Sequence, residues 1–150
     1  MEFVMTDYHG HHVPLAGPDD AGEWFDEQAS SIMPHGGRGQ TIWFGPVDAP
    51  AQLRVDVDID AGRAALRWAD GSYGVQLDPT VPITVLESPD SATIDVPAWL
   101  ARTDSSTARL AVAEYVSTGH RPTCVTWSLP ADRERTKRRE GIPHQVGSSG

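Results

Sequence analysis

Three aspartates at alternate positions, Asp56, Asp58 and Asp60, have a type and spacing that could bind a calcium ion. Carboxylates two residues apart open the EF-hand loop, which also needs glycine at its sixth position and glutamate at its twelfth. Here those two positions hold Ala61 and Arg67. The sequence therefore favours a strand with aspartates on one face over a calcium site.

Histidines near the N-terminus, at His9, His11 and His12, are a second candidate, because imidazole is a common ligand of transition metals. Distant His35 or His120 could complete such a site. No carboxylate pattern accompanies these histidines, and the His-Glu-x-x-His motif is missing. We expect a polar loop here. A small metal-dependent hydrolase that uses the N-terminal histidines or the strand aspartates is the alternative function.

Other signatures of catalysis are missing from the sequence. The glycine cluster at residues 35–39 lacks the Lys-Ser/Thr ending of a phosphate-binding loop. There is no Gly-x-Ser-x-Gly elbow and no His-x-Glu with Pro-Cys-x-x-Cys, the signature of nucleobase deaminases. Cys124 is the only cysteine, which excludes an intrachain disulfide and a cysteine zinc site. The sequence predicts no catalytic residue, no metal and no cofactor.

The charge is strongly and unevenly acidic. The chain of 150 residues carries 12 basic and 21 acidic side chains, a net charge of −9. Residues 131–150 hold five basic and three acidic ones, which leaves the first 130 residues with a net charge of −11. Such a charge repels nucleic acid and anionic membranes and attracts a basic partner. The alternative explanation is that the charge only keeps the protein soluble.

No apolar stretch approaches the roughly 20 residues that span a bilayer. The first ten residues do not show the basic and then apolar pattern of a signal peptide. We therefore expect a cytoplasmic protein.

In the middle of the chain apolar and polar residues alternate, as they do in antiparallel strands with one buried face. In residues 53–60 apolar side chains occupy one face, and an arginine and the three aspartates occupy the other, which predicts a half-buried strand with one solvent-facing side. Residues 64–68 form the next strand, and Asp70-Gly71 predicts a hairpin turn. Tyr73, Val75 and Leu77 are expected to continue the inward face. Further strands are expected at residues 41–47, 83–87, 92–96 and 125–129, and one helical turn at residues 97–101.

Two helices are predicted. Pro18, Asp19 and Asp20 suit a first turn, and apolar side chains at helical spacing continue to Ile32. The second helix follows a capping residue among 104–106, carries an apolar stripe over residues 108–116 and ends at Gly119. The order of elements predicts an α+β fold, an antiparallel sheet of about six to eight strands packed by two helices. We expect one domain over residues 1–130 and a charged, disordered tail over residues 131–150.

Residues 66–79 (LRWADGSYGVQLDP), the helix at 105–119 and the ending RPTCVTW at 121–127 carry a resemblance. This combination resembles the actinobacterial branch of immunity protein family one, from bacterial polymorphic toxin systems. Members are typically encoded beside toxins of the nucleic-acid deaminase superfamily. The resemblance implies an antitoxin, with no enzymatic activity, that binds a cognate toxin and often covers its active site.

The expected partner is therefore a basic, nucleic-acid-acting toxin, with no direct binding of nucleic acid or membrane, and the chain is expected as a monomer or in a one-to-one complex. A regulatory domain that self-associates is a third possibility. The candidate contact residues lie on the aspartate face of one strand or in and near the hairpin, and Tyr73 could equally belong to the core. They are Asp56, Asp58, Asp60, Asp70, Tyr73 and Asp78. Four residues are assigned to packing instead: Trp68, Val112, Tyr115 and Trp127.

Overall fold

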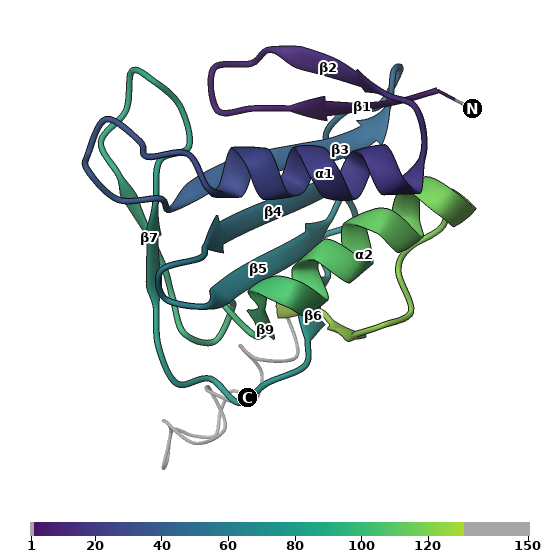
Figure 1. Cartoon of the computed structure of the whole chain (residues 1–150). Helices are drawn as coiled ribbons and strands as arrows, with labels where there is room; N and C mark the ends of the chain where they lie inside the picture. The colour runs from purple at the N-terminus through teal and green to yellow at the C-terminus, as the bar shows by residue number, and fades with distance from the viewer. Residues whose placement is uncertain (1, 131–150) are drawn as a thin grey trace, which may run out of the picture.

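Strands precede, separate and follow two helices along the chain. The computed structural model describes residues 2–130 (Figure 1). In chain order the elements are β1 Phe3–Thr6, β2 His12–Leu15, α1 Pro18–Ala29, β3 Gln40–Pro46, β4 Leu53–Asp58, β5 Arg63–Trp68, β6 Tyr73–Val75, β7 Ile83–Val85, β8 Ile94–Val96, β9 Thr103–Asp104, α2 Ser105–Thr118 and β10 Thr126–Ser128.

Eight of these strands form one antiparallel sheet. Its order is β10-β6-β5-β4-β3-β1-β2, and the short β9 pairs with β5. Both helices lie across the same face of the sheet, as Figure 1 shows. The predicted α+β class, with an antiparallel sheet packed by two helices, is confirmed. Among residues 2–130 no helix is long and apolar enough to cross a membrane.

The main core lies between the helices and the sheet. Alternate side chains of β3, β4 and β5 point toward the helices, and Leu53, Val55 and Val57 are fully buried there. Phe25 of α1 and Tyr115 of α2 pack onto them. Tyr115 also meets Trp68 edge-on at 5.0 Å, and Trp68 meets Trp127 at 6.2 Å. The four residues assigned to packing therefore lie in this core or against it.

The helix ends follow local chemistry. The first turn of α1 has Pro18 and two aspartates, as predicted, but the helix ends at Ala29 and leaves Ile32 66% exposed beyond it. Asp104 caps α2 by accepting a 2.7 Å hydrogen bond from the backbone N–H of Thr107. Gly119 then ends α2 in the left-handed conformation, with φ +76°, which glycine adopts without a steric penalty.

The β7–β8 hairpin packs on the opposite face of the sheet. Among the described residues its two strands pair with each other and with no other strand, and Val85 and Val96 bury against Ala65 and Tyr73 of the sheet. The predicted helical turn after β8 is present as a hydrogen-bonded turn, in which the backbone N–H groups of residues 100 and 101 donate to Pro97. This hairpin gives the domain a second, smaller core.

Three details differ from the sequence-based expectations. Residues 3–6 form strand β1, buried throughout between β2 and β3, where the sequence predicted no strand, and the polar loop expected at the histidines follows it at residues 7–11. The strand expected at residues 53–60 ends at Asp58, and a turn follows. Tyr73 and Val75 are inward but belong to the second core, because Tyr73 pairs with Arg67 and shares its face of the sheet.

The outer strand β2 carries a proline. Pro14 lies opposite Val4 of β1, and no strand pairs with the far side of β2 among the described residues. Proline is tolerated at such an edge because it has no N–H to donate. The predicted tail at residues 131–150 lies outside the described residues, so the division of the chain stays a prediction.

Candidate functional site

Asp56, expected on the solvent-facing side of its strand, is completely buried. It points to the sheet face opposite the helices, as the alternation predicts, but its carboxylate is covered. Nη2 atoms of Arg54 and Arg67 each lie 3.1 Å from its oxygens, and the Thr41 hydroxyl donates to it at 2.6 Å. The solvent-facing prediction is therefore wrong for Asp56, because these side chains enclose its carboxylate.

Three of the other candidate acids lie near one end of β4 and β5. Asp58 is half-buried at the end of β4, and Asp60 is exposed in the turn that follows. Arg63 pairs with Asp58 across the strands and donates from Nη1 to the Asp78 carbonyl at 3.2 Å. The chain therefore brings Asp58, Asp60 and Asp78 into one region, where a partner could reach them.

Asp70 lies at the other end of β5, in the exposed turn before β6. Its Oδ1 accepts hydrogen bonds from the Ser72 N–H at 2.8 Å and from the Ser72 hydroxyl at 2.6 Å. These bonds, with the nearby Arg121 cation, lower the pKa of the Asp70 carboxyl. Asp70 is thus a charged residue that shapes its own turn.

Tyr73 is only 6% exposed. Its ring meets the ring of Trp99 edge-on, with 5.3 Å between the ring centroids, within the range of about 4.5–7 Å usual for aromatic pairs. Tyr73 is therefore a core residue that also lines a pocket on this face of the sheet.

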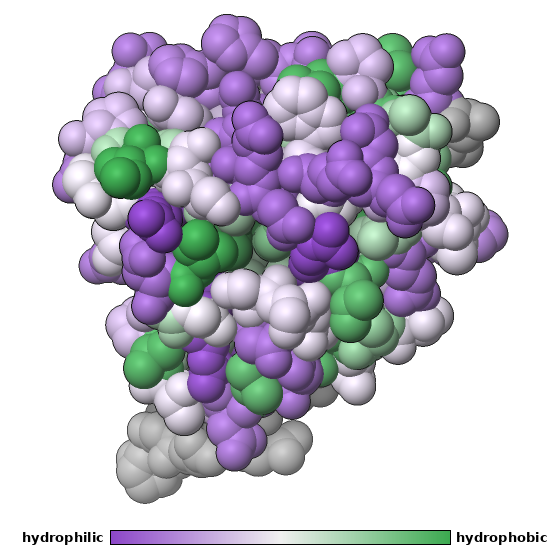
Figure 2. All heavy atoms as spheres, in the orientation of Figure 1, coloured by the Kyte–Doolittle hydropathy of each residue, from purple (hydrophilic) through white to green (hydrophobic). Residues whose placement is uncertain are grey.

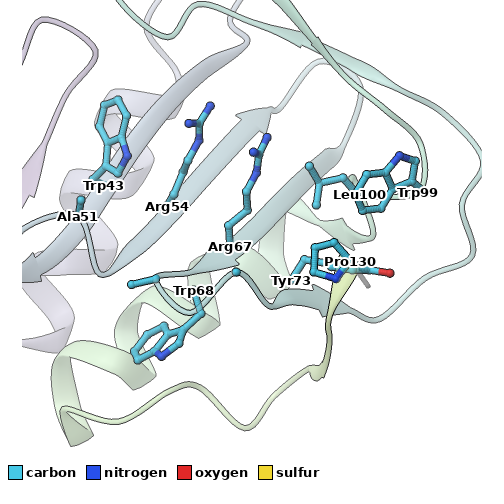
Figure 3. Close-up of a pocket in the computed structure, with 11 residues that line it drawn as sticks. Trp43, Ala51, Arg54, Arg67, Trp68, Tyr73, Trp99, Leu100 and Pro130 are labelled. Carbon is cyan, nitrogen blue, oxygen red and sulfur yellow. The ribbon is translucent and has the colours of Figure 1, made fainter. Parts of the chain in front are cut away.

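A single row of side chains crosses this face from one edge of the sheet to the other. Each member is the Cα partner of the next in the antiparallel register: His12, Thr6, Trp43, Arg54, Arg67, Tyr73 and Ser128. Directly opposed residues have Cβ atoms about 4.5–5.5 Å apart, close enough for their side chains to interact. Figure 3 shows the side chains of Trp43, Arg54 and Arg67 projecting to the same side, and that of Trp68 to the other.

The two arginines in this row are neutralised unequally. Arg54 donates to both Asp56 oxygens and, at 2.7 Å, to Glu87, and its guanidinium lies 5.8 Å from the centre of the Trp43 ring. Among the described residues, Arg67 forms an ion pair with Asp56 alone. Its Nε is buried and has no hydrogen-bond partner in that part of the chain. The Asp56 carboxylate thus forms ion pairs with both guanidinium groups. Arg54 has a second carboxylate partner in Glu87, so Arg67 is the less neutralised of the two.

The pKa directions agree with this geometry. Burial disfavours the charged form of Arg54, but the carboxylates of Asp56 and Glu87 outweigh burial and raise its pKa. Burial lowers the pKa of Arg67, Asp56 offsets only part of that effect, and the Arg54 cation lowers the pKa further. Arg67 is the cation of the pair that would gain more from a further carboxylate.

Two pockets adjoin along the row, and Trp43 and Ala51 line both of them. One, of about 340 Å³, is lined by Arg54, Arg67, Tyr73 and Trp99 as well. The other, of about 430 Å³, lies over the β1–β2 turn and includes His9 and His12. The two pockets together, defined by these linings, are the sheet groove.

Two of the N-terminal histidines lie beside polar side chains. His12 shares a 2.8 Å hydrogen bond with Thr6, and the ring of His11 lies 3.3 Å from an Asp7 oxygen. Within residues 2–130 no group of three His, Cys, Asp or Glu side chains is placed to hold a metal ion. The arginine and aromatic side chains of the groove suit recognition of another protein.

Trp43, Arg54 and Arg67 are not among the site residues predicted from the sequence. A signal was available, because alternation places Arg54 on the same strand face as Asp56, and Arg67 on the same face as Ala65 in the next predicted strand. What the sequence lacked was the register that places Trp43 beside them.

The helix side has a different character. Helix α1 has five acidic residues and no basic one: Asp19, Asp20, Glu23, Asp26 and Glu27. Arg109 of α2 pairs with Asp26, with 2.9 Å between Nε and Oδ1. Figure 2, seen from the helix side, shows hydrophilic side chains gathered over α1. The two faces of the sheet therefore differ, one covered by an acidic helix and the other open at a groove lined by arginine and aromatic side chains.

Comparison with known proteins places this arrangement in a family. The family model described as immunity protein Imm1 matches residues 9–129, a stretch that includes every element from β2 to β10. No curated protein and no solved structure gives a significant match to the chain. The chain therefore belongs to the immunity protein Imm1 family, and it is a non-enzymatic immunity protein that binds a cognate toxin.

Proposed function

We propose that the cognate toxin is a basic protein that acts on nucleic acid, specifically a nucleic-acid deaminase. We further propose that the chain acts in the cytoplasm and inhibits the toxin as a one-to-one complex that covers its active site. The observation that carries this proposal is the acidity of the fold, a net charge of −11 over residues 1–130 in a member of an immunity family.

The acidic charge supports a basic partner on physical grounds. A protein that binds nucleic acid presents cations to phosphate groups, and an acidic inhibitor presents carboxylates to the same cations. Helix α1 contributes five of these carboxylates without a compensating base in the helix. Complementary fields of this kind accelerate encounter and reject wrong partners more than they add affinity.

The exposed and half-buried candidate acids are proposed as contacts at the margin of the interface. Asp58, Asp60 and Asp78 gather at one end of β4 and β5, and Asp70 lies at the other end of β5. Asp56 and Tyr73 are buried. We therefore assign Asp56 the role of holding the two arginines in place, and Tyr73 the role of forming part of the wall of the sheet groove.

The deaminase assignment is supported by the resemblance of residues 66–79 and 105–127 to immunity proteins encoded beside deaminase toxins. It has a direct test. The toxin domain encoded next to this chain is co-expressed with it, and the mixture is separated by size exclusion. We expect one peak with the mass of one copy of each protein, and restored growth of cells that carry the toxin.

The purified toxin domain is then assayed for conversion of cytosine to uracil and of adenine to hypoxanthine in oligonucleotides, with and without one equivalent of the chain. Loss of deamination at one equivalent supports the full proposal. A toxin that binds the chain and shows no deamination would remove the deaminase assignment and leave the toxin–immunity pair intact. No complex and no rescue would remove the pairing itself. A toxin domain from an unrelated system is the control for non-specific acidic binding.

A further inference from the structure

The sheet groove contains the residue types that dominate the energetics of protein interfaces. Tryptophan, tyrosine and arginine are enriched among residues whose truncation costs most binding energy. Here Trp43, Arg54, Arg67 and Tyr73 stand side by side because they are consecutive partners on β3, β4, β5 and β6. The strands hold their backbones rigidly, so little conformational freedom remains to be lost on binding.

The charge of the groove selects its occupant. Arg54 already contacts two carboxylates, those of Asp56 and Glu87. Arg67 shares Asp56 with Arg54 and has a buried Nε without a hydrogen-bond partner among the described residues. A guanidinium has five N–H donors in a planar fork that matches a carboxylate. A carboxylate placed over Arg67 would give its guanidinium, on a side chain that is 33% exposed, a second anionic partner.

The aromatic side chains define the rest of the site. Trp43 lines both pockets, Trp99 lines the first, and both are only half-buried. An acidic side chain that projects from a loop could place its carboxylate on Arg67 while its neighbours in sequence pack on Trp43 and Trp99. Such a loop fits the first pocket of the sheet groove, which has a volume of about 340 Å³ and is open to solvent.

We propose that the sheet groove is the specific docking site for the toxin, and that it takes a toxin loop whose Asp or Glu carboxylate pairs with Arg67 between Trp43 and Trp99. This inference rests on the proposed function, since it takes the toxin as the partner. The acidic helix side then provides long-range attraction, and the groove provides the contact.

The first test uses the unaltered chain and the toxin domain encoded beside it. Hydroxyl-radical footprinting measures the oxidation of each tryptophan in the free chain and in the complex. Trp43, in the groove, and Trp24, on α1, are both half-buried and form a matched pair on opposite faces. We expect several-fold protection of Trp43 and none of Trp24. Protection of Trp24 alone would place the toxin on the helices and overturn the proposal.

The second test changes the arginine. Arg67→Gln removes the charge, Arg67→Lys keeps the charge and removes the fork, and Arg109→Gln removes an ion-paired arginine from the helix side. Circular dichroism checks that each variant is folded before its Kd for the toxin is measured. We expect Arg67→Gln to weaken binding about tenfold or more, Arg67→Lys to weaken it less, and Arg109→Gln to change it by less than about twofold.

The carboxylate is identified by replacing exposed Asp and Glu residues of the toxin with Asn and Gln. One replacement should weaken binding to the unaltered chain about tenfold and have little effect on binding to Arg67→Gln. Tight binding by the unaltered chain that no Arg67 or toxin variant changes would overturn the groove proposal and leave the immunity function in place. Failure of the unaltered chain to bind would overturn both.

One other occupant can be separated from the toxin. Pro130 lines the same pocket, so the chain that continues from it begins at the groove. If deletion of residues 131–150 raised Trp43 oxidation in the free chain and left toxin affinity unchanged, the groove would hold that segment, and the toxin would bind elsewhere. We expect the deletion to leave Trp43 protection by the toxin unchanged.

Discussion

Asp56 organises the charged side chains of the groove. It is fully buried, and it holds two guanidinium groups and one hydroxyl at 2.6–3.2 Å. A buried charge is tolerated when hydrogen bonds satisfy it, and the two arginines remain partly exposed to water. The residue therefore has a structural role that also determines where the two cations stand.

Replacing Asp56 with alanine is expected to lower the free energy of unfolding by about 3 kcal/mol or more, because two partly buried cations lose their shared carboxylate. Urea denaturation of both proteins measures the difference. Asp60→Ala is the matched control, since Asp60 is exposed and its Oδ1 lies 3.6 Å from Nη1 of Arg38 in a surface ion pair. The control should cost less than about 1 kcal/mol. Equal losses in the two variants would contradict the role assigned to Asp56.

The start of α2 depends on one carboxylate. Burial raises the pKa of Asp104, but hydrogen bonds from Thr107, Gln76 and Ser106 outweigh it and lower the pKa from 3.8 to about 2. A carboxyl whose pKa is lower in the folded state stabilises the fold above its unfolded pKa. That contribution disappears as the pH falls through the folded value.

Asp104→Ala is therefore expected to cost about 0.5–2 kcal/mol near neutral pH, the usual value of an N-terminal cap. The difference from the unaltered chain should shrink as the pH falls below about 4, and the part that depends on charge should be lost only below about pH 2, where the folded-state carboxyl becomes mostly protonated. Urea denaturation across this range measures it. A cost that does not change with pH would show that the cap stabilises α2 through its hydrogen bond and not through its charge. Asp104→Asn, which keeps a side-chain oxygen at the cap and removes the charge, provides the comparison.

The β7–β8 hairpin attaches to the sheet through a close backbone approach at Gly39. The N–H of Leu86 donates to the Gly39 carbonyl at 3.0 Å, and a Cβ at Gly39 would lie 1.8 Å from the Thr84 carbonyl oxygen. No side chain fits at that distance, so one of the two backbones must move.

Gly39→Ala is expected to destabilise the chain by about 1–3 kcal/mol, the usual cost of overpacking, and to increase hydrogen exchange in β7 and β8 first. Gly17→Ala is the control, because a Cβ there meets nothing within 4 Å and its backbone is extended. Unchanged exchange in β7 and β8 would mean that the hairpin is held without this contact.

Hydrophobic periodicity, turn residues and helix-capping residues made most elements predictable from the sequence. The alternation in β4 and β5, the Asp70-Gly71 turn and the cap and stop of α2 are local signals, and each appears where the sequence predicts it. Strand β1 was missed because a strand buried between two neighbours has no alternation, and its four residues are all buried. The candidate site was predicted only in part, since the register that aligns Trp43 with the arginines depends on pairings between distant segments.

Across the whole molecule, the acidic helix α1 and the proposed toxin-binding groove lie on opposite faces of the sheet. The first 130 residues have a net charge of −11, with five acids on α1, and the groove on the opposite face has two arginines. Long-range attraction depends on the total charge, whereas a short-range ion pair in the groove depends on local geometry. The rates of association and dissociation should therefore respond differently to salt.

Raising the ionic strength from about 0.05 to about 0.5 M is expected to slow association with the toxin by about tenfold or more, because salt screens exposed charges beyond a few ångströms. Dissociation should change much less. Biolayer interferometry at a series of salt concentrations separates the two rates. An association rate that is insensitive to salt would contradict steering by the acidic surface and would not contradict toxin binding itself.

Pro14 in β2 also constrains how this protein can associate with others. A sheet edge with free N–H and C=O groups is a template on which another chain can add a strand, the route to domain swapping and fibrils. Pro14 pairs with Val4 on its inner side and has no N–H to offer on its outer side, and β2 is only four residues long. The β2 edge of the sheet is thus protected against pairing with another copy of the chain, and a copy that does not polymerise at this edge stays available to bind its toxin.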